Sequence, residues 1–242
     1  MNEWGINNDF ICVRGETRTN TKVYEKSGAL TELNEPGPQI SKEQQEELVK
    51  KLEGYAHEET LFVLAGSIPN GVDKQIYSEI IPRVHAKGAK VLLDADGELF
   101  RNALKEKPDI IKPNRVELEE YFGFDYRVSM EELLEAARKL QAQGIETVAV
   151  SMGKSGAMMV REGYEVKCPA LSVKAHSTVG AGDAMVAALA YAWENKLGNE
   201  ETVRLCMAAS AGAVTTIGTK PPTRALVDEL LEQVVIEQIS AK

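Results

Sequence analysis

A glycine-rich loop that ends in an aspartate is the feature of this chain whose residue types could do chemistry. Residues 179–185 read Val-Gly-Ala-Gly-Asp-Ala-Met, and they lead into an apolar run over 186–193 that predicts a buried helix. Glycines let the backbone approach a ligand closely, and a helix that begins there points unpaired N–H groups and its positive dipole end at the same spot. Amides at Gly180, Ala181 and Gly182, beside the carboxylate of Asp183, suit the transfer of a phosphoryl group to a hydroxyl.

The same loop has a plainer interpretation. It could be a helix N-terminus with glycines in its entry turn and an aspartate that the helix dipole favours. A short glycine motif alone is weak evidence for a site. The interpretation as a site therefore depends on polar residues elsewhere in the chain.

A second candidate stretch, Lys112-Pro113-Asn114-Arg115-Val116-Glu117, follows a predicted strand. Lys112 supplies a cation and Asn114 an amide, and Glu117 lies one helical turn beyond Asn114 on the same face. Oxygen ligands with retained waters are what Mg²⁺ prefers. Asn114 could equally cap the next helix, because Asn is a preferred N-cap residue and Pro ends a strand.

Two more turns after predicted strands carry hydroxyl groups and glycines. One is Gly66-Ser67-Ile68-Pro69 and the other is Ser151-Met152-Gly153. Each could also be an ordinary connecting loop. Ser67, Ser151 and Gly153 are the candidate binding residues of these turns.

Near the N-terminus, residues 15–24 form a segment of alternating character. Strand side chains alternate between faces, so Arg18, Asn20 and Lys22 share one face. A face with these polar and charged side chains suits the binding of an anion, whereas it does not suit packing into a hydrophobic core. A solvated edge strand is the alternative interpretation.

Short apolar runs alternate with amphipathic segments along the chain. The predicted strands are residues 61–65, 90–94, 109–111, 147–151 and 157–160, and the predicted helices are residues 41–54, 73–87, 98–105, 115–122, 129–143, 199–216 and 223–240. Ser41 and Ser129 both begin capping-box patterns. Apolar strands alternating with helices predict an α/β fold with a mostly parallel sheet covered on both faces. Ligands bind beyond the carboxyl ends of such strands, so the candidate residues should converge there.

The bulk composition narrows the functional classes. The 242 residues carry a net charge of −9, with a pI near 5.1, which argues against nucleic acid or an anionic membrane as a partner. No apolar run approaches the length of a membrane span, which is about 20 residues, and no signal peptide is evident. The three cysteines lack metal-ligand spacing and are interpreted as reduced core residues of a cytoplasmic protein.

Residues 177–188, Ser-Thr-Val-Gly-Ala-Gly-Asp-Ala-Met-Val-Ala-Ala, resemble position by position the C-terminal signature of the PfkB (ribokinase-like) carbohydrate kinases. With the other motifs, the chain looks closest to the branch of 1-phosphofructokinases and tagatose-6-phosphate kinases. The resemblance implies one ribokinase-like domain over residues 1–242, with part of a β-sheet lid at residues 10–34. It also implies ATP and Mg²⁺ as cofactors and a small-molecule sugar phosphate as substrate.

The resemblance assigns a role to each candidate residue. Asp183 would be the catalytic base, with Gly180, Ala181 and Gly182 as the anion hole. The nucleotide would be bound by Lys112, Asn114, Ser151 and Gly153. Asn114 and Glu117 would hold Mg²⁺ through water. The sugar phosphate would be bound by Arg18, Asn20, Lys22 and Ser67, with Arg18 on the phosphate.

The sequence also departs from the family pattern. The family begins with a strand that carries an Asn-Pro-x-x-Asp motif for sugar hydroxyls, then has further lid strands and a Gly-Gly-Lys-Gly segment, and none of these is present in the sequence. We therefore expect an N-terminally incomplete domain that is less stable than a full-length relative and prone to aggregate or to pair with another chain. A fragment, a start codon placed too late or a degraded gene would each explain this.

Two functional hypotheses follow. In the first, the chain is an ATP-dependent kinase that phosphorylates a phosphorylated hexose, with fructose 1-phosphate favoured and tagatose 6-phosphate or fructose 6-phosphate as alternatives. In the second, it is a catalytically dead, nucleotide-binding remnant of such a kinase. A homodimer closed by the lid is one assembly that the resemblance allows.

Overall fold

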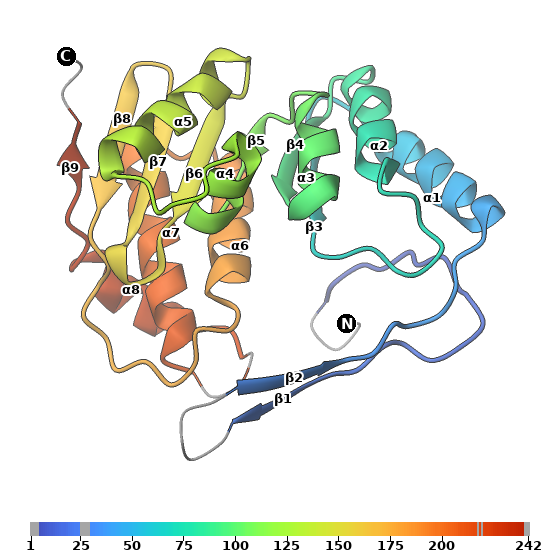
Figure 1. Cartoon of the computed structure of the whole chain (residues 1–242), viewed down its shortest axis with the longest axis horizontal. Coiled ribbons are helices and arrows are strands. Elements are labelled where there is room, and N and C mark those ends of the chain that lie inside the picture. Colours follow the sequence, from blue (N-terminus) through green and yellow to red (C-terminus); the bar gives the residue numbers. More distant parts are fainter. Residues whose placement is uncertain (1–4, 25–29, 217, 219, 240–242) are drawn as a thin grey trace.

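The computed structural model of the chain describes residues 5–24, 30–216, 218 and 220–239. It consists of a large seven-stranded sheet with helices on both faces and a separate two-stranded hairpin (Figure 1). The hairpin strands are β1 (Asn20–Tyr24) and β2 (Leu30–Asn34), paired antiparallel with Asn20 opposite Asn34. Within the described residues, no helix is long and apolar enough to cross a lipid bilayer.

The strands of the large sheet follow one another in chain order. They are β3 (Leu61–Ala65), β4 (Lys90–Asp94), β5 (Ile110–Ile111), β6 (Thr147–Ser151), β7 (Ala157–Arg161), β8 (Tyr164–Cys168) and β9 (Glu237–Gln238). The strands β3 to β6 pair in parallel, and the strands β6 to β9 pair antiparallel. The α/β architecture and the mostly parallel sheet are as predicted. The carboxyl ends of β3 to β6 meet at one edge, which is where the candidate residues follow the strands.

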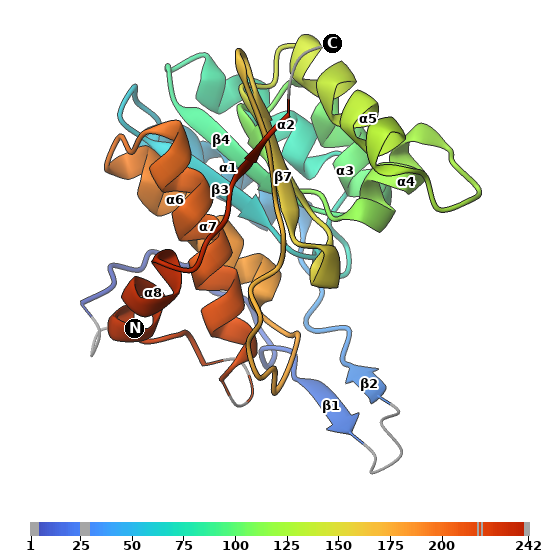
Figure 2. The ribbon, with the colours of Figure 1, turned by 90° about the vertical axis from the view of Figure 1, so that its left-hand side faces the viewer.

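Helices cover both faces of this sheet. They are α1 (Lys42–Tyr55), α2 (Ile76–His85), α3 (Gly97–Leu104), α4 (Arg115–Phe122), α5 (Met130–Ala142), α6 (Ala181–Glu194), α7 (Asn199–Val214) and α8 (Arg224–Leu231). Helices α6, α7 and α8 lie on one side of the sheet, with α2 to α5 on the other (Figure 2). Each face has its own hydrophobic core: Val91 and Leu93 of β4 face one core, and Leu92 faces the other. This alternation follows from the period of two along a strand.

Local sequence signals set several helix boundaries. Ser41 caps α1 in a capping box with Gln44, and Ser129 caps α5 in a capping box with Glu132, as predicted. In both boxes the serine hydroxyl accepts the backbone N–H of the partner, whose side chain accepts the N–H of the serine. These bonds satisfy donors that the helix ends would otherwise leave unpaired.

Two expectations from the sequence are wrong. The last helix does not extend over 223–240: α8 ends at Leu231, and Glu237–Gln238 form β9 against β8 (the predicted end, Ser240, lies outside the described residues). Val234 between them is buried against the core. Cys168 and Cys206 are buried as expected, but Cys12 is exposed.

Candidate active site

The N-terminus of α6 has the features that the sequence predicts for an anion site. Gly180 precedes the helix with φ of +84°, a left-handed conformation that favours glycine. The N–H groups of Ala181, Gly182 and Asp183 have no hydrogen-bond acceptor among the described residues, and the first intrahelical bond runs from the Ala184 N–H to the Gly180 carbonyl at 2.8 Å. Free amides at the positive end of a helix dipole favour negative charge. The side chain of Asp183, in this first turn, is exposed.

Lys112, directly after β5, lies beside this helix terminus. Its side chain is only 5% exposed, and its Nζ is 3.0 Å from Oδ1 of Asp94 at the end of β4. A Cβ placed on Gly182 would lie 3.5 Å from the same Nζ. Lys112, which is predicted to bind the nucleotide, therefore lies next to the first turn of α6, and it also has a carboxylate partner, Asp94, that the sequence did not point to.

Asn114 and Glu117 form a capping box at the start of α4. The Glu117 N–H donates to Asn114 Oδ1 at 2.9 Å, and the Asn114 N–H donates to Glu117 Oε2 at 2.7 Å. The capping interpretation of Asn114 is thus confirmed. Burial raises the pKa of Glu117, and the neighbouring carboxylates of Asp94 and Asp96 raise it further, against the opposing effects of the Asn114 N–H and Lys112.

The loops after β5 and β6 are joined side by side. Asn114 and Ser151 form a parallel bridge, and the Ser151 N–H donates to the Pro113 carbonyl at 3.0 Å. Gly153, with φ of +56°, begins a short 3₁₀ turn over Gly153–Ser155. The parallel sheet therefore brings these two predicted loops together, although they are far apart in sequence.

A cavity of about 980 Å³ occupies the space between these loops and helices α6 and α7. The residues that line it include Lys112, Asn114, Ser151, Gly153, Ala181 and Gly182. All four residues predicted to bind the nucleotide are therefore in one cavity with two residues of the predicted anion hole. Its size falls in the range of small-molecule sites, which is about 300–1,000 Å³.

Asp183 faces a different space. It lines a cavity of about 530 Å³ together with Gly180 and residues of α6, α7 and α8. The first turn of α6 thus borders both cavities: Ala181 and Gly182 line the larger one, and Gly180 and Asp183 line the smaller one.

Three of the predicted sugar-phosphate residues, Arg18, Asn20 and Ser67, line neither of these cavities. Arg18 precedes β1, and its Nη2 donates to Ser67 Oγ at 2.7 Å. This bond links the segment before the β1–β2 hairpin to the turn after β3. Arg18 has no ion-pair partner among the described residues, and its side chain is exposed. Asn20 is exposed in β1, whereas the side chain of Lys22 in the same strand lies outside what the structure describes.

Two groups of residues at this site were not predicted from the sequence. Asp94 could have been found, because it ends a predicted strand in the same way as the residues that were assigned. The apolar residues Met185 and Met207, which also line the large cavity, could not have been found, because α7 meets the loop over 170–175 only in the folded chain.

Among the described residues, no group of three or more His, Cys, Asp or Glu side chains is placed to ligate a metal ion directly. Mg²⁺ is commonly bound through one or two carboxylates, several waters and substrate phosphates. Glu117, with Asp94 and Asp96 near it, fits that looser arrangement, because only its Oε2 is used by the Asn114 cap.

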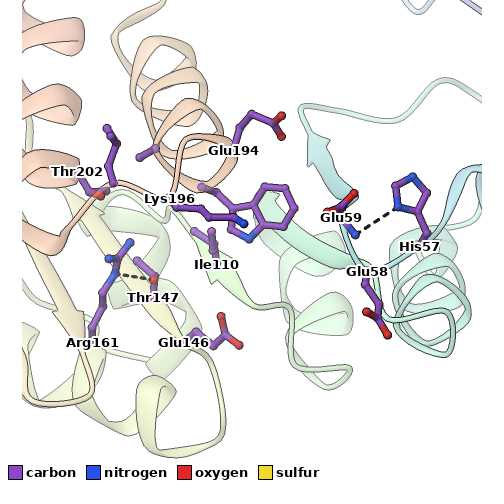
Figure 3. A pocket seen from close by; sticks show the side chains of 13 residues that line it. His57, Glu58, Glu59, Ile110, Glu146, Thr147, Arg161, Glu194, Lys196 and Thr202 are labelled. Carbon is purple, nitrogen blue, oxygen red and sulfur yellow. Dashed lines mark hydrogen bonds between the residues drawn. The ribbon is translucent and has the colours of Figure 1, made fainter.

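A further cavity, of about 760 Å³, lies at the opposite end of the sheet, at the amino ends of β3, β5 and β6 (Figure 3). Arg161 donates to Thr147 there, and Lys196 and Glu146 also line the space. It shares no lining residue with the two cavities at α6.

Comparison with known proteins gives one consistent result. Residues 1–226 match the pfkB family of carbohydrate kinases. The chain is 37% identical to the 1-phosphofructokinase of Haemophilus influenzae, over 99% of this chain and 76% of that protein. It is 33% identical to the 1-phosphofructokinase of Vibrio cholerae, over 98% of this chain and 74% of that protein. The crystal structure of phosphofructokinase-2 from Escherichia coli in complex with potassium matches it with a TM-score of 0.83 and 27% identity, over 90% of this chain and 71% of that chain.

Proposed function

The chain belongs to the pfkB family of carbohydrate kinases, and we propose that it transfers the γ-phosphoryl group of ATP to a hydroxyl of fructose 1-phosphate. The product would be fructose 1,6-bisphosphate. The observation that carries the proposal is that the first turn of α6, whose N–H groups are free, lines two cavities: Ala181 and Gly182 line the larger one and Asp183 lines the smaller one.

In this proposal the larger cavity holds ATP. Its triphosphate lies at the polar end, where the amides of Ala181 and Gly182 and the ammonium of Lys112 meet. Fixed donors of this kind stabilise the charge on the transferring group without having to reorganise during the reaction. Asn114 and Glu117 would hold Mg²⁺ through water, and the ion would neutralise charge on the phosphates.

Asp183 is the proposed catalytic base. It is exposed to the smaller cavity, in which the acceptor hydroxyl would approach, and no other described side chain bonds to its carboxylate. A carboxylate at that position accepts the hydroxyl proton as the oxygen attacks phosphorus.

Arg18 is the proposed partner of the phosphate that the acceptor already carries. Its guanidinium has Ser67 as a neutral hydrogen-bond partner and no carboxylate partner in the part of the chain that the structure describes. A planar guanidinium that is not neutralised is well suited to a phosphate. We propose fructose 1-phosphate, and not another sugar phosphate, as the acceptor because relatives at 33–37% identity are named 1-phosphofructokinases.

The test is ADP release by the 242-residue chain with Mg-ATP, measured with and without fructose 1-phosphate. Asp183→Asn should lower kcat by about 10²–10⁴, with little change in the KM for ATP, because only proton transfer is removed. Asp125→Asn, at an exposed aspartate in the loop after α4, is the matched control and should retain full turnover. Unchanged turnover in Asp183→Asn would remove this residue from the mechanism.

A second candidate function is nucleotide binding without transfer. The observation in its favour is that Arg18 and Ser67 line neither cavity, whereas the nucleotide residues share one. ATP binding by a folded chain that releases no sugar-dependent ADP would establish this second function.

A further inference from the structure

Two of the cations that line the larger cavity already have a counter-charge within the fold. Lys112 pairs with Asp94 at 3.0 Å, and the Nε of Arg115 lies 2.8 Å from Oε1 of Glu119. Arg115 and Glu119 are each 11% exposed, and the same Oε1 also accepts the backbone N–H of Val128. Neither Lys112 nor Arg115 therefore leaves an excess of positive charge at the cavity.

Two further cations line the same cavity without a counter-charge. Arg127 lies in the loop between α4 and α5, and Lys154 lies in the 3₁₀ turn that follows β6. Both side chains are exposed, and in the part of the chain that the structure describes neither charged group forms an ion pair or a hydrogen bond. Among the described residues, Glu119 is the one carboxylate that lines the cavity, and it is paired with Arg115. The cavity therefore carries an excess of positive charge, in a chain whose net charge is −9.

Exposed lysine and arginine side chains are usually solvated, and one of them alone would not indicate a ligand. Here two such side chains come from separate loops and line one cavity, beside residues that are proposed to meet the nucleotide. Lys154 directly follows Gly153, and Arg127 directly precedes Val128, whose carbonyl accepts a hydrogen bond from Arg115. Like-signed charges gathered at a cleft raise the local concentration of oppositely charged ligands.

We propose that Arg127 and Lys154 bind the phosphates that the nucleotide keeps after transfer, its α- and β-phosphates. The proposal rests on the proposed function, which puts the γ-phosphoryl group at the amides of Ala181 and Gly182. The rest of the nucleotide then lies in the larger cavity, where the cations without a counter-charge are Arg127 and Lys154. A ligand with several anionic oxygens suits two cations that reach it from separate loops.

The test measures the Kd of Mg-ATP and of Mg-ADP by isothermal titration calorimetry. It compares the unsubstituted chain with Arg127→Gln, Lys154→Gln and the double variant, because glutamine keeps a polar side chain and removes the charge. At low salt, each single substitution should raise the Kd for Mg-ATP by about 3-fold and the double substitution by about 10-fold, as expected for exposed charge pairs. The Kd for Mg-ADP should rise by the same factors, because ADP keeps both of these phosphates.

Salt supplies a second readout that a merely structural defect would not change. The Debye length falls from about 10 Å at 0.1 M salt to about 3 Å at 1 M, so in 1 M NaCl the four chains should differ in Kd by less than about 2-fold. Lys87→Gln is the matched control. Lys87 is exposed in the turn after α2 and lines none of the three cavities, so its substitution should change neither Kd at either salt concentration.

The outcomes separate this proposal from the proposed function. If the double variant binds both nucleotides as tightly as the unsubstituted chain, or if its loss of affinity is the same at low and high salt, the inference is wrong while nucleotide binding stands. A rise in Kd for Mg-ATP but not for Mg-ADP would place the two cations on the γ-phosphate and would also overturn it. The expected changes in Kd, in a chain that releases no sugar-dependent ADP, would support this inference and overturn the proposed transfer. If the unsubstituted chain binds no nucleotide, both proposals fail.

Discussion

Replacing Asp94 with Asn should destabilise the protein far more than the loss of a surface charge. The side chain of Lys112 is 5% exposed, and Asp94 is the carboxylate that pairs with it, at 3.0 Å. Asparagine keeps the shape of the side chain but removes the negative charge. The ammonium of Lys112 is then left in the interior without its counter-charge.

The structure sets the expected size of the effect. Breaking one partner of a buried ion pair costs about 3–5 kcal/mol. The carboxylate of Asp94 is 17% exposed, so water can partly replace it, and we expect a loss of about 3 kcal/mol in the free energy of unfolding, at the lower end of that range. With a urea m-value of about 2 kcal/mol/M, the unfolding midpoint falls by about 1.5 M.

The assay is urea unfolding of Asp94→Asn, Lys112→Met and the double variant. Because the two groups interact, the double variant should lose less than the sum of the single losses, by about 2 kcal/mol. Glu98→Gln is the matched control: Glu98 pairs with Lys74 at 2.7 Å, but the two side chains are 58% and 61% exposed, so the loss should stay below about 1 kcal/mol.

A loss below 1 kcal/mol in Asp94→Asn, or strictly additive single losses, would refute this reasoning. Either result would mean that Lys112 is solvated or paired elsewhere. The ammonium would then not be fixed beside Gly182, and its proposed role at the phosphates would lose its structural basis.

Two further predictions concern the same site. Gly180→Ala should lower the free energy of unfolding by about 1–2 kcal/mol in urea titrations, because φ is +84° and the new Cβ meets nothing within 4 Å, so only backbone strain acts. Gly182→Ala, where φ is not positive, should not destabilise the chain, and equal losses in the two variants would contradict this. Because the pKa of the Glu117 carboxyl is raised, the folded chain keeps the carboxyl proton to a higher pH than the unfolded chain does. The protonated carboxyl therefore contributes stability that is fully present below the ordinary carboxyl pKa and is lost as pH rises through the folded pKa. The stability of Glu117→Gln relative to the unsubstituted chain should therefore increase over that range in urea titrations at stepped pH, and a constant difference would refute the assignment.

Much of the local structure could be predicted because short-range chemistry decides it. The serine and asparagine caps at Ser41, Ser129 and Asn114 form as the sequence indicates, since each cap joins groups only three residues apart. The left-handed residue before α6 is the glycine that such a turn requires. The alternation of apolar strands and helices likewise predicts the parallel sheet and the edge at which the candidate loops gather.

The C-terminus shows where this reasoning fails. The amphipathic pattern that begins at Thr223 continues past Leu231, yet the chain leaves the helix there and adds β9 to the edge of β8. Residues 234–236 are Val-Val-Ile, which suit a strand as well as a helix, and Val234 is buried in the core. Pairing with a distant strand decided between two local structures that the sequence left nearly equal.

The sequence by itself determined the chemical groups of this protein and their local geometry: the free amides and aspartate at the start of α6, and the cap that holds Asn114 and Glu117. Only the tertiary structure decided which groups meet. The pairing of Lys112 with Asp94 and the bond between Arg18 and Ser67 each join segments that a local pattern cannot relate. The physical reason is that caps and turns depend on neighbours along the chain, whereas ion pairs and cavities depend on how the sheet and helices pack.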